Sequence, residues 1–369
     1  MMPRLRPMQF EDYAGVQAVL TRNGLSGETP VEWRNLWTGN PAWQEHKDLP
    51  LGWVLETVSG AIVGVGHCVP AIYWLNGRKL LAAVGRGGAV DREFRADSVA
   101  IFQAFFEQAR PDLLINTSAN PVAGKLWQAF GAQPVPHATY DEVLLWVTNY
   151  PQVIASAAYQ RWGRKQDSWA WATGRLVQCW HYVNRRCRMQ RASAEVIRLV
   201  GFDERFDHLL EQLRVVPDKL HAARDRDTLT WHFSRAEAHG TLVVLLAVNH
   251  GVPVGYLVAV REDRLALRIT RYSVADIQTL PDQRPAVGSL LSRMVRIARQ
   301  EGVGVVEVTG LAAEKRRWLE ELRPLRRRLS TWPFYFRCRR QDLSEPRLWD
   351  PTLYDGDSSI GAGAVANVT

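Results

Sequence analysis

The stretch from residue 80 to residue 131 constrains the fold most strongly, because it joins an apolar strand to a helix through small residues. Residues 80–84 are all apolar and predict a strand. Three glycines follow and allow close backbone approach: Gly85, Gly87 and Gly88. Apolar residues then recur at helical spacing over 99–109, so a helix is expected to begin at Asp97 or Ser98, which are both favourable N-caps.

This order of elements indicates a binding site for an anion. A strand that turns through small residues into a helix directs free amide N–H groups and the positive end of the helix dipole toward one point. Phosphate and pyrophosphate groups bind at such points. An ordinary strand–helix unit, in which the glycines serve packing alone, is the competing interpretation.

Two short blocks in this stretch resemble the GNAT acyl-CoA N-acyltransferases. The first block is a strand ending in Val, an aromatic-Arg pair and a small-residue loop that opens a helix. Its positions are occupied by Val90, Phe94, Arg95, Ala96, Ser98 and Ala100, with Arg92 where proline is usual. The second block, N-x-x-A-x-x-L-Y-x-x-x-G-F, is met by Asn120, Ala123, Leu126 and Gly131, with Trp127 and Ala132 at the aromatic positions. The resemblance covers roughly residues 1–147.

The rest of the first half predicts the elements around this unit. Asn76-Gly77 is a strong turn signal and predicts a hairpin between strands at 71–75 and 78–84. The strand at 140–147 is expected to close the first unit. Further elements are expected at 4–9, 12–20, 29–43, 51–57, 61–69, 113–118 and 122–130.

The chain is long enough for two domains. It has 369 residues, 46% of them hydrophobic, and contains no run long and apolar enough for a membrane span. Residues 1–9 include prolines and arginines and do not resemble a signal peptide. The cysteines show no metal-ligand spacing: Cys68, Cys179, Cys187 and Cys338. We therefore expect a cytoplasmic protein with reduced thiols and no metal.

A basic, Trp-rich segment at 150–193 separates the two halves. It holds eight Lys and Arg residues against one acidic residue, which accounts for nearly all of the chain's formal net charge of +8. Its aromatic residues are interleaved with these charges: Trp162, Trp169, Trp171, Trp180 and Tyr182. Such a helical stretch suits an anionic membrane surface or a lipid-phosphate carrier. The alternative is a helical hairpin packed between the domains with solvated arginines.

A second α/β pattern begins at residue 194 and repeats the order of the first. It resembles a diverged second GNAT domain, as in tandem GNAT and Fem-type aminoacyltransferases. The segment RDRDTLTWHF at 224–233 resembles one in proteins of bacterial surface-polysaccharide clusters, with His232 in place of Arg. No glycine-rich loop precedes the helix expected at 287–300, and Pro285 has no N–H to offer a phosphate.

We therefore expect an α/β (α+β) protein with two GNAT-like domains, each a mixed, mostly antiparallel sheet flanked by helices, joined by a basic helical connector. The expected divisions are 1–149, the connector at 150–193, 194–345 and a tail at 346–369. The tail is expected to be a packed turn around Asp355-Gly356-Asp357 followed by a loose terminus.

The resemblance also implies where acyl-CoA binds. The backbone of residues 85–90 would pair with the pantetheine arm, and the amides of residues 95–100 would hold the pyrophosphate. The expected cofactor-binding residues are Gly88, Val90, Arg95, Ala96, Asp97, Ser98, Val99, Ala100 and Asn120.

Three residues are catalytic candidates in the first half. Trp127 stands where the family has the tyrosine that protonates the departing thiolate, but an indole N–H is a donor and not an acid near neutral pH. His67 is a candidate general base, with a packed structural role as the alternative. Ser118, together with Asn116, ends the strand at 113–118 and is expected to orient the acceptor or a water.

These features predict an acyl-CoA-dependent N-acyltransferase that uses acetyl-CoA or another acyl-CoA. The acceptor is expected to be a small-molecule or lipid-linked amine, and the resemblance suggests an amino sugar of a surface-glycan precursor. Two alternatives stay open: a Fem-type aminoacyltransferase that uses aminoacyl-tRNA, and a catalytically degenerate binding or scaffold protein. The preferred function requires no nucleic acid and places the connector at the inner membrane face.

Overall fold

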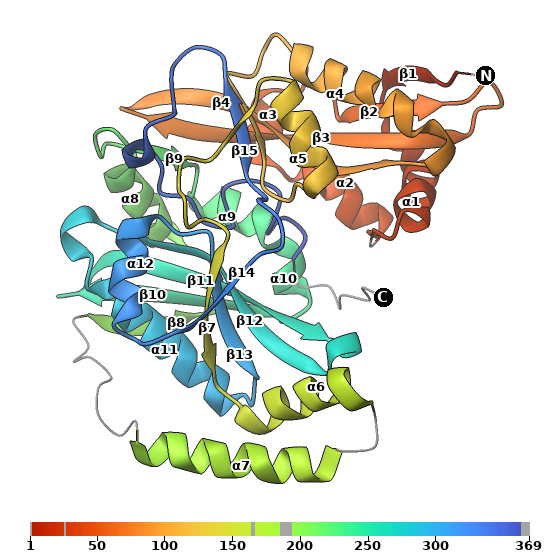
Figure 1. Cartoon of the computed structure of the whole chain (residues 1–369). Helices are drawn as coiled ribbons and strands as arrows, with labels where there is room; N and C mark the ends of the chain where they lie inside the picture. The colour runs from red at the N-terminus through yellow and green to blue at the C-terminus, as the bar shows by residue number, and fades with distance from the viewer. Residues whose placement is uncertain (1, 26, 164–166, 185–193, 363–369) are drawn as a thin grey trace.

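The computed structural model describes residues 2–25, 27–163, 167–184 and 194–362 and contains two large sheets (Figure 1). The first sheet has the spatial order β1-β2-β3-β4-β5-β15-β6, and β9 pairs with the end of β3. Its strands are β1 (Arg4–Pro7), β2 (Gly52–Glu56), β3 (Ile62–Leu75), β4 (Arg78–Val90), β5 (Leu113–Asn116), β15 (Tyr335–Cys338), β6 (Gln133–Pro134) and β9 (Leu220–Ala222). Strands β4 and β5 pair in parallel, and the other pairs are antiparallel.

Strands β3 and β4 form a long hairpin in the first sheet. Its turn is Asn76-Gly77, and both residues have positive φ angles, 51° and 73°, as a type I′ turn requires. The expected turn is therefore confirmed. The two short strands expected at 61–69 and 71–75 are in fact one strand, because β4 pairs with β3 from Gly64 to Leu75.

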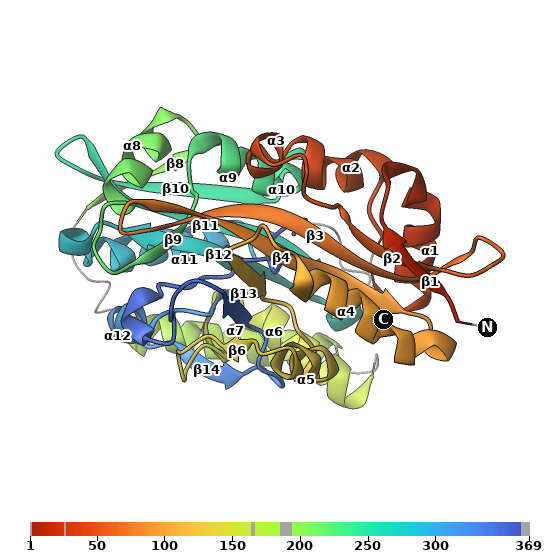
Figure 2. The ribbon, with the colours of Figure 1, turned by 90° about the horizontal axis from the view of Figure 1, so that it is seen from above.

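Helices cover both faces of the first sheet (Figure 2). On one face lie α1 (Tyr13–Arg22), α2 (Pro30–Thr38) and α3 (Pro41–Glu45), and on the other lie α4 (Ser98–Glu107) and α5 (Pro121–Ala129). Trp33 and Trp37 of α2 are fully buried in the core on the first face. Trp127 of α5 packs edge-on against Phe105 and Phe106 of α4 in the core on the second face.

The second sheet repeats the strand order of the first. In space it runs β8-β10-β11-β12-β13-β7-β14, and its β12–β13 pair is parallel like β4–β5. Its strands are β8 (Glu195–Leu199), β10 (Leu242–Asn249), β11 (Val252–Arg264), β12 (Ile269–Thr279), β13 (Val305–Thr309), β7 (Glu142–Val147) and β14 (Leu325–Arg328). Its helices are α8 (Glu204–Leu213), α9 (Arg226–His232) and α10 (Ser234–Ala238) on one side, and α11 (Ala286–Gln300) and α12 (Ala313–Glu320) on the other. The fold class expected from the repeated pattern is confirmed.

The two halves exchange one strand each. Strand β7 lies between β13 and β14 in the second sheet, where Val147 pairs with Val305. Strand β15 lies between β5 and β6 in the first sheet, where Tyr335 pairs with Asn116. The expectation that 140–147 closes the first sheet is therefore wrong. An apolar strand satisfies its backbone hydrogen bonds equally well in either sheet, so its local sequence does not select the partner.

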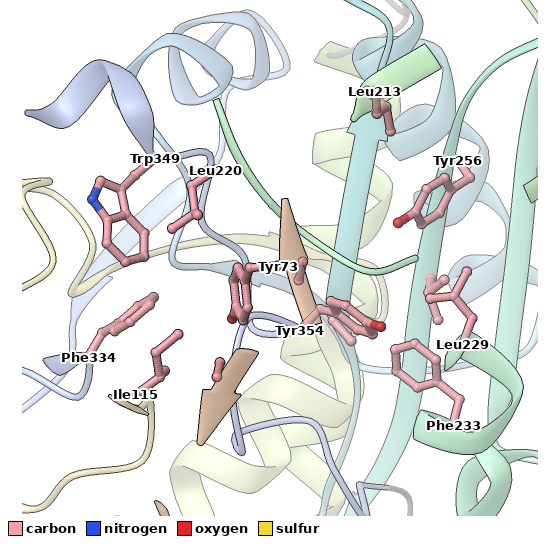
Figure 3. Packing of buried hydrophobic residues seen from close by; sticks show 14 of the residues in the cluster. Tyr73, Ile115, Leu213, Leu220, Leu229, Phe233, Tyr256, Phe334, Trp349 and Tyr354 are labelled. Atoms are coloured by element: carbon pink, nitrogen blue, oxygen red, sulfur yellow. The ribbon is translucent and has the colours of Figure 1, made fainter. Parts of the chain in front are cut away.

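A shared apolar core joins the halves (Figure 3). It brings together Tyr73 and Ile115 from the first half, Phe233 and Tyr256 from the second half, and Tyr354 from the tail. The expected packed turn in the tail is confirmed, because Asp355 and Asp357 are buried, and the burial continues to Ile360. Residues 363–369 lie outside the described residues.

The connector is a helical hairpin on the outer side of the second half, and does not lie between the halves (Figure 1). Helices α6 (Tyr150–Trp162) and α7 (Asp167–Asn184) pack closely, and a Cβ on Gly174 would stand 2.4 Å from the Cα of Pro151. Within the described residues, no helix is long and apolar enough to cross a membrane. Several of the connector's basic residues lie outside the described residues: Arg164, Lys165, Arg185, Arg186, Arg188 and Arg191.

Candidate functional site

The parallel strands β4 and β5 separate at one point in the first sheet. Their last paired residues are Val84 and Ile115. Beyond this point the side chain of Asn116 bridges the gap, and its Nδ2 donates a hydrogen bond of 2.7 Å to the carbonyl oxygen of Gly85. The Oδ1 atom of Asn116 is buried and has no hydrogen-bond partner among the described residues. A ligand N–H group entering the gap would satisfy this oxygen.

A bulge in β4 follows this gap. The register between β3 and β4 shifts after Val65, and Gly87 has a φ angle of 57°. A Cβ on Gly87 would stand 2.9 Å from Nδ1 of His67, so the position requires glycine for space as well as conformation. Gly88 is exposed with open space around it, whereas Val90 pairs with Gly64 inside the sheet.

The helix expected to hold a pyrophosphate, α4, begins at Ser98 with Asp97 at the N-cap position, as predicted, but another helix directly precedes it. A 3-10 helix at Arg92–Asp97 runs directly into α4. The Ser98 N–H donates to the carbonyl oxygen of Arg95, and the Ser98 hydroxyl donates to the same oxygen at 2.7 Å. The Ser98 amide is therefore not free, and the positive end of this helical run lies at Arg92. Several residues assigned to phosphate binding are exposed around it: Arg95, Ala96 and Val99.

Two arginines add positive charge near this helix start. Arg92 and Arg95 have exposed side chains on the 3-10 helix. Asp91, which precedes that helix, accepts a hydrogen bond of 2.6 Å from Arg22. Asp97 precedes α4 but makes no side-chain cap, and Ala100 lies in the first turn. An anion at this place would thus meet guanidinium groups and the end of the 3-10 helix, in place of the amides of 95–100.

His67 is buried, and both of its ring nitrogens have partners. The indole N–H of Trp33 donates to Nε2 at 3.1 Å, so Nδ1 carries the proton and faces the carbonyl oxygen of Arg86 at 3.2 Å. Burial, together with the positive charge of Arg86, lowers the pKa of His67 to about 4. A neutral ring in this position holds β3, β4 and α2 together, and it has no free nitrogen to offer an acceptor amine.

Trp127 and Asn120 have structural contacts in α5. The Asn120 side chain caps the helix and accepts from the N–H groups of Val122 and Ala123 at 3.0 and 2.9 Å. Trp127 is 4% exposed and packs against α4. A Cβ on Gly85 would stand 3.1 Å from its ring, so Trp127 forms part of the wall behind the gap between β4 and β5.

Ser118 lies at the end of β5 and contacts the tail. Its hydroxyl donates to the carboxylate of Asp357, which also accepts from the backbone N–H of Thr117 at 2.8 Å. The tail glycine Gly356 has a φ angle of 143° and packs on Thr117, where a Cβ would stand 2.4 Å from the threonine methyl. The D-G-D segment thus lies over the point where β4 and β5 separate, and no pattern in the sequence indicated that position.

A buried charge cluster fixes the same tail. Arg224 donates to Asp276 of β12 at 2.8 Å and to Asp355 of the tail at 2.9 Å, and all three residues are at most 5% exposed. Burial opposes ionisation of Asp276, but Arg224 outweighs it and lowers the pKa of that carboxyl. Burial raises the pKa of Asp355 in spite of Arg224. The first arginine of the RDRDTLTWHF segment therefore links the second sheet to the tail.

A cavity of about 380 Å³ opens on the α3 side of the first sheet, between α3, β3 and α9. Its inner wall includes Gly356 and Ile360 of the tail and Val84, the last β4 residue paired with β5. Its charged lining consists of three carboxylate residues, Glu45, Asp225 and Asp227, and two basic residues, Lys79 and Arg214, of which Lys79 pairs with Glu45. The cavity therefore approaches the gap between β4 and β5 from the face opposite α4 and α5.

A lysine occupies the equivalent place in the second half. Strands β12 and β13 also separate after their last pair, Val274 and Val308. Lys315, the third residue after the N-cap of α12, is 5% exposed and donates to the carbonyl oxygen of Ile277 and to Gln278, both at 2.8 Å. The third residue after the N-cap of α5 is Ala123. A small residue thus leaves space in the first half, where a lysine fills it in the second.

Neither a protein-family model nor a curated protein matches this sequence. Solved structures do resemble it. A GCN5-related N-acetyltransferase from Anabaena variabilis matches with a TM-score of 0.54 and 15% identity over 91% of this chain and 72% of that one. A probable N-acyltransferase from Enterococcus faecalis matches with a TM-score of 0.56 and 11% identity over 92% and 73%.

An N-myristoyltransferase from Saccharomyces cerevisiae, solved with bound myristoyl-CoA, matches with a TM-score of 0.53 and 9% identity, over 98% of this chain and 85% of that one. Identities this low establish the arrangement of the chain and nothing about its substrates. The predicted GNAT-like fold is confirmed. This chain shares its two-sheet fold with GCN5-related N-acetyltransferases and with N-myristoyltransferase.

Proposed function

We propose that this protein is an acyl-CoA-dependent N-acyltransferase that binds acyl-CoA between β4 and β5 of the first sheet. The observation that carries the proposal is the separation of these strands beside the buried, unpartnered Oδ1 of Asn116. The pantetheine arm contains amide N–H groups that suit this oxygen and the exposed strand edge at Gly88. The exposed side chains of Arg92 and Arg95 then lie where the pyrophosphate would reach the helix.

The acceptor would enter from the opposite face, through the cavity between α3, β3 and α9. Its lining holds three carboxylates against two cations, Lys79 and Arg214, and this net negative charge favours an amine that is cationic in water. The amine must lose a proton before it attacks, and solvent in this open cavity can accept it. We propose acetyl-CoA as the donor and an amino sugar as the acceptor class, on the strength of the sequence resemblance.

Binding and turnover experiments test this proposal separately. Acetyl-CoA should bind at micromolar concentration in a calorimetric titration and raise the melting temperature of the protein. Mass spectrometry with a panel of amines that includes amino sugars should then detect an acetylated product. Binding without turnover on any amine would favour a scaffold role. Absence of acetyl-CoA binding, combined with salt-sensitive tRNA binding, would favour the aminoacyl-tRNA alternative.

We further propose that the connector docks on an anionic membrane surface. Trp162, Trp171 and Leu176 are 57%, 44% and 72% exposed on the outer hairpin, where indole and leucine side chains can enter a lipid interface. Arg161 and Arg175 are exposed on the same hairpin. A lipid-linked acceptor would then be presented to an enzyme that is already at the membrane.

Vesicle sedimentation tests this docking. Replacing Trp162, Trp171 and Leu176 with Gln should reduce binding to vesicles with anionic lipid by at least about tenfold, because the apolar insertion is lost. Raising the salt concentration should weaken binding of the unmodified protein. Val31→Gln with Val200→Gln removes apolar side chains that are 78% and 99% exposed elsewhere, and it should leave vesicle binding unchanged. Equal losses in the two variants would contradict docking through the hairpin.

A further inference from the structure

Transfer of an acyl group from a thioester expels a thiolate, and a nearby acid or hydrogen-bond donor lowers the barrier to its departure. Helix α5 does not supply a phenol as this donor, because Trp127 stands where the second GNAT block has a tyrosine. Its indole is buried against α4 and lacks an ionisable proton at neutral pH. A donor for the leaving sulfur therefore has to come from another element.

The exchanged strand β15 brings a phenol to this place. Tyr335 pairs with Asn116, and residues directly opposite each other in an antiparallel pair project from the same face. Tyr335 belongs to the same apolar cluster as Leu114 and Trp127, on the face of the sheet that α4 and α5 cover. Its side chain thus lies between α5 and the end of β5, beside the amide that bridges the gap.

The absence of a side chain at Gly124 makes room for this phenol. A Cβ at Gly124 would stand 2.7 Å from the Tyr335 hydroxyl oxygen and 2.9 Å from its ring. The ring is 8% exposed, and the hydroxyl has no hydrogen bond to any described residue. Burial raises the pKa of Tyr335, so the hydroxyl carries its proton at neutral pH. The Oδ1 of Asn116, on the adjacent strand at the same register, is unpartnered as well.

The Oδ1 of Asn116 is buried without a partner, and at the same register the Tyr335 hydroxyl, which is not fully buried, bonds no described residue. Together they fit a ligand with both a donor and an acceptor. Resting on the acyl-CoA function proposed above, we propose that Tyr335 is the catalytic residue that donates its O–H to the sulfur of the leaving CoA. Asn116 would hold the adjacent pantetheine amide through its free Oδ1. The second half of the chain thereby completes the reaction site of the first.

The chemistry balances with groups already named. The amine nitrogen attacks the thioester carbonyl carbon, the C–S bond breaks, and its electron pair passes to sulfur. Sulfur takes the proton from the Tyr335 hydroxyl, while the nitrogen releases its extra proton to solvent. Solvent then reprotonates the phenolate. The net products are an amide and CoA with a free thiol, with no oxidant or metal consumed.

The test compares CoA with desulfo-CoA, which lacks the thiol, across a range of pH. A hydrogen bond from Tyr335 to the bound thiolate lowers the pKa of the bound thiol below that of free CoA, so in the unmodified protein the preference for CoA over desulfo-CoA should increase as the pH rises from the lower of these pKa values to the higher. In Tyr335→Phe this increase should move to higher pH by about one unit. The control Tyr272→Phe removes a buried phenol in the second half and should not change the pH dependence.

Each outcome decides a different point. A shift in Tyr335→Phe alone supports the assignment, and turnover should then fall about 100-fold with an unchanged KM for acyl-CoA. Tight CoA binding with the same pH dependence in both proteins would overturn the role of Tyr335 and leave the proposed function intact. Failure of the unmodified protein to bind CoA would overturn the proposed function, and the assignment with it.

Discussion

Replacing Arg224 with Met should lower the free energy of unfolding by about 3–5 kcal/mol. Arg224 donates short hydrogen bonds of 2.8 and 2.9 Å to Asp276 and Asp355. Its replacement removes these bonds and leaves both carboxylates buried without their shared counter-charge. Tyr256 still donates to Asp276 at 2.5 Å, but a neutral donor does not compensate a buried carboxylate. A domain is typically stable by about 5–15 kcal/mol, so urea denaturation should detect the loss easily.

Arg226→Met is the matched control for this change. Arg226 lies two residues away, but its side chain is 48% exposed and pairs with the exposed carboxylate of Asp227. Its replacement should cost less than about 1 kcal/mol. Adding Asp276→Asn and Asp355→Asn to Arg224→Met should recover part of the lost stability, because the unpaired charges are removed. A loss below about 1 kcal/mol in Arg224→Met would show that the cluster does not hold the tail in place.

Replacing Ala123 with Lys should weaken acetyl-CoA binding by more than about 100-fold, equivalent to roughly 2.7 kcal/mol. The equivalent residue of the second half is Lys315, whose ammonium group occupies the gap beyond β12 and β13. A lysine at position 123 would reach into the gap between β4 and β5 in the same way and would fill the space proposed for pantetheine. Calorimetric titration with acetyl-CoA measures the loss.

Val122→Lys provides the control for charge and helix composition. Val122 is the preceding residue of α5 and is 69% exposed, so a lysine there points to solvent. It should change acetyl-CoA affinity by less than about twofold. Equal losses in the two variants would place the cofactor on the outer surface of α5, outside the gap. Full affinity in Ala123→Lys would exclude the gap itself as the pantetheine site.

The sequence alone was sufficient to predict many of the local helices, strands and turns and the repetition of their order in the second half. Asn76-Gly77 determined a hairpin turn, because a type I′ turn needs a positive φ angle at both central residues, and Asn and Gly adopt such angles readily. The turn joins two strands that are adjacent in the chain. The apolar period of 99–109 determined the helix after β4, and the contrast between small residues there and Pro285 in the second half is the reason why acyl-CoA binding is proposed for the first half. These signals depend on neighbours in the chain, which the sequence contains directly.

Tertiary structure alone decided the composition of the site. The alternation in Tyr335–Cys338 fits any sheet, so nothing local indicated that Tyr335 would lie beside Asn116, more than two hundred residues earlier. The turn at Asp355-Gly356-Asp357 was expected to pack, but nothing local indicated its partners, because Arg224 and Thr117 meet it from distant segments. His67 is a candidate base in the sequence, but in the structure the indole N–H of Trp33 donates a hydrogen bond to its Nε2 atom. In each case the deciding interaction joins groups that the tertiary fold brings together from separate parts of the chain, because hydrogen bonds and charges act through space without regard to sequence separation.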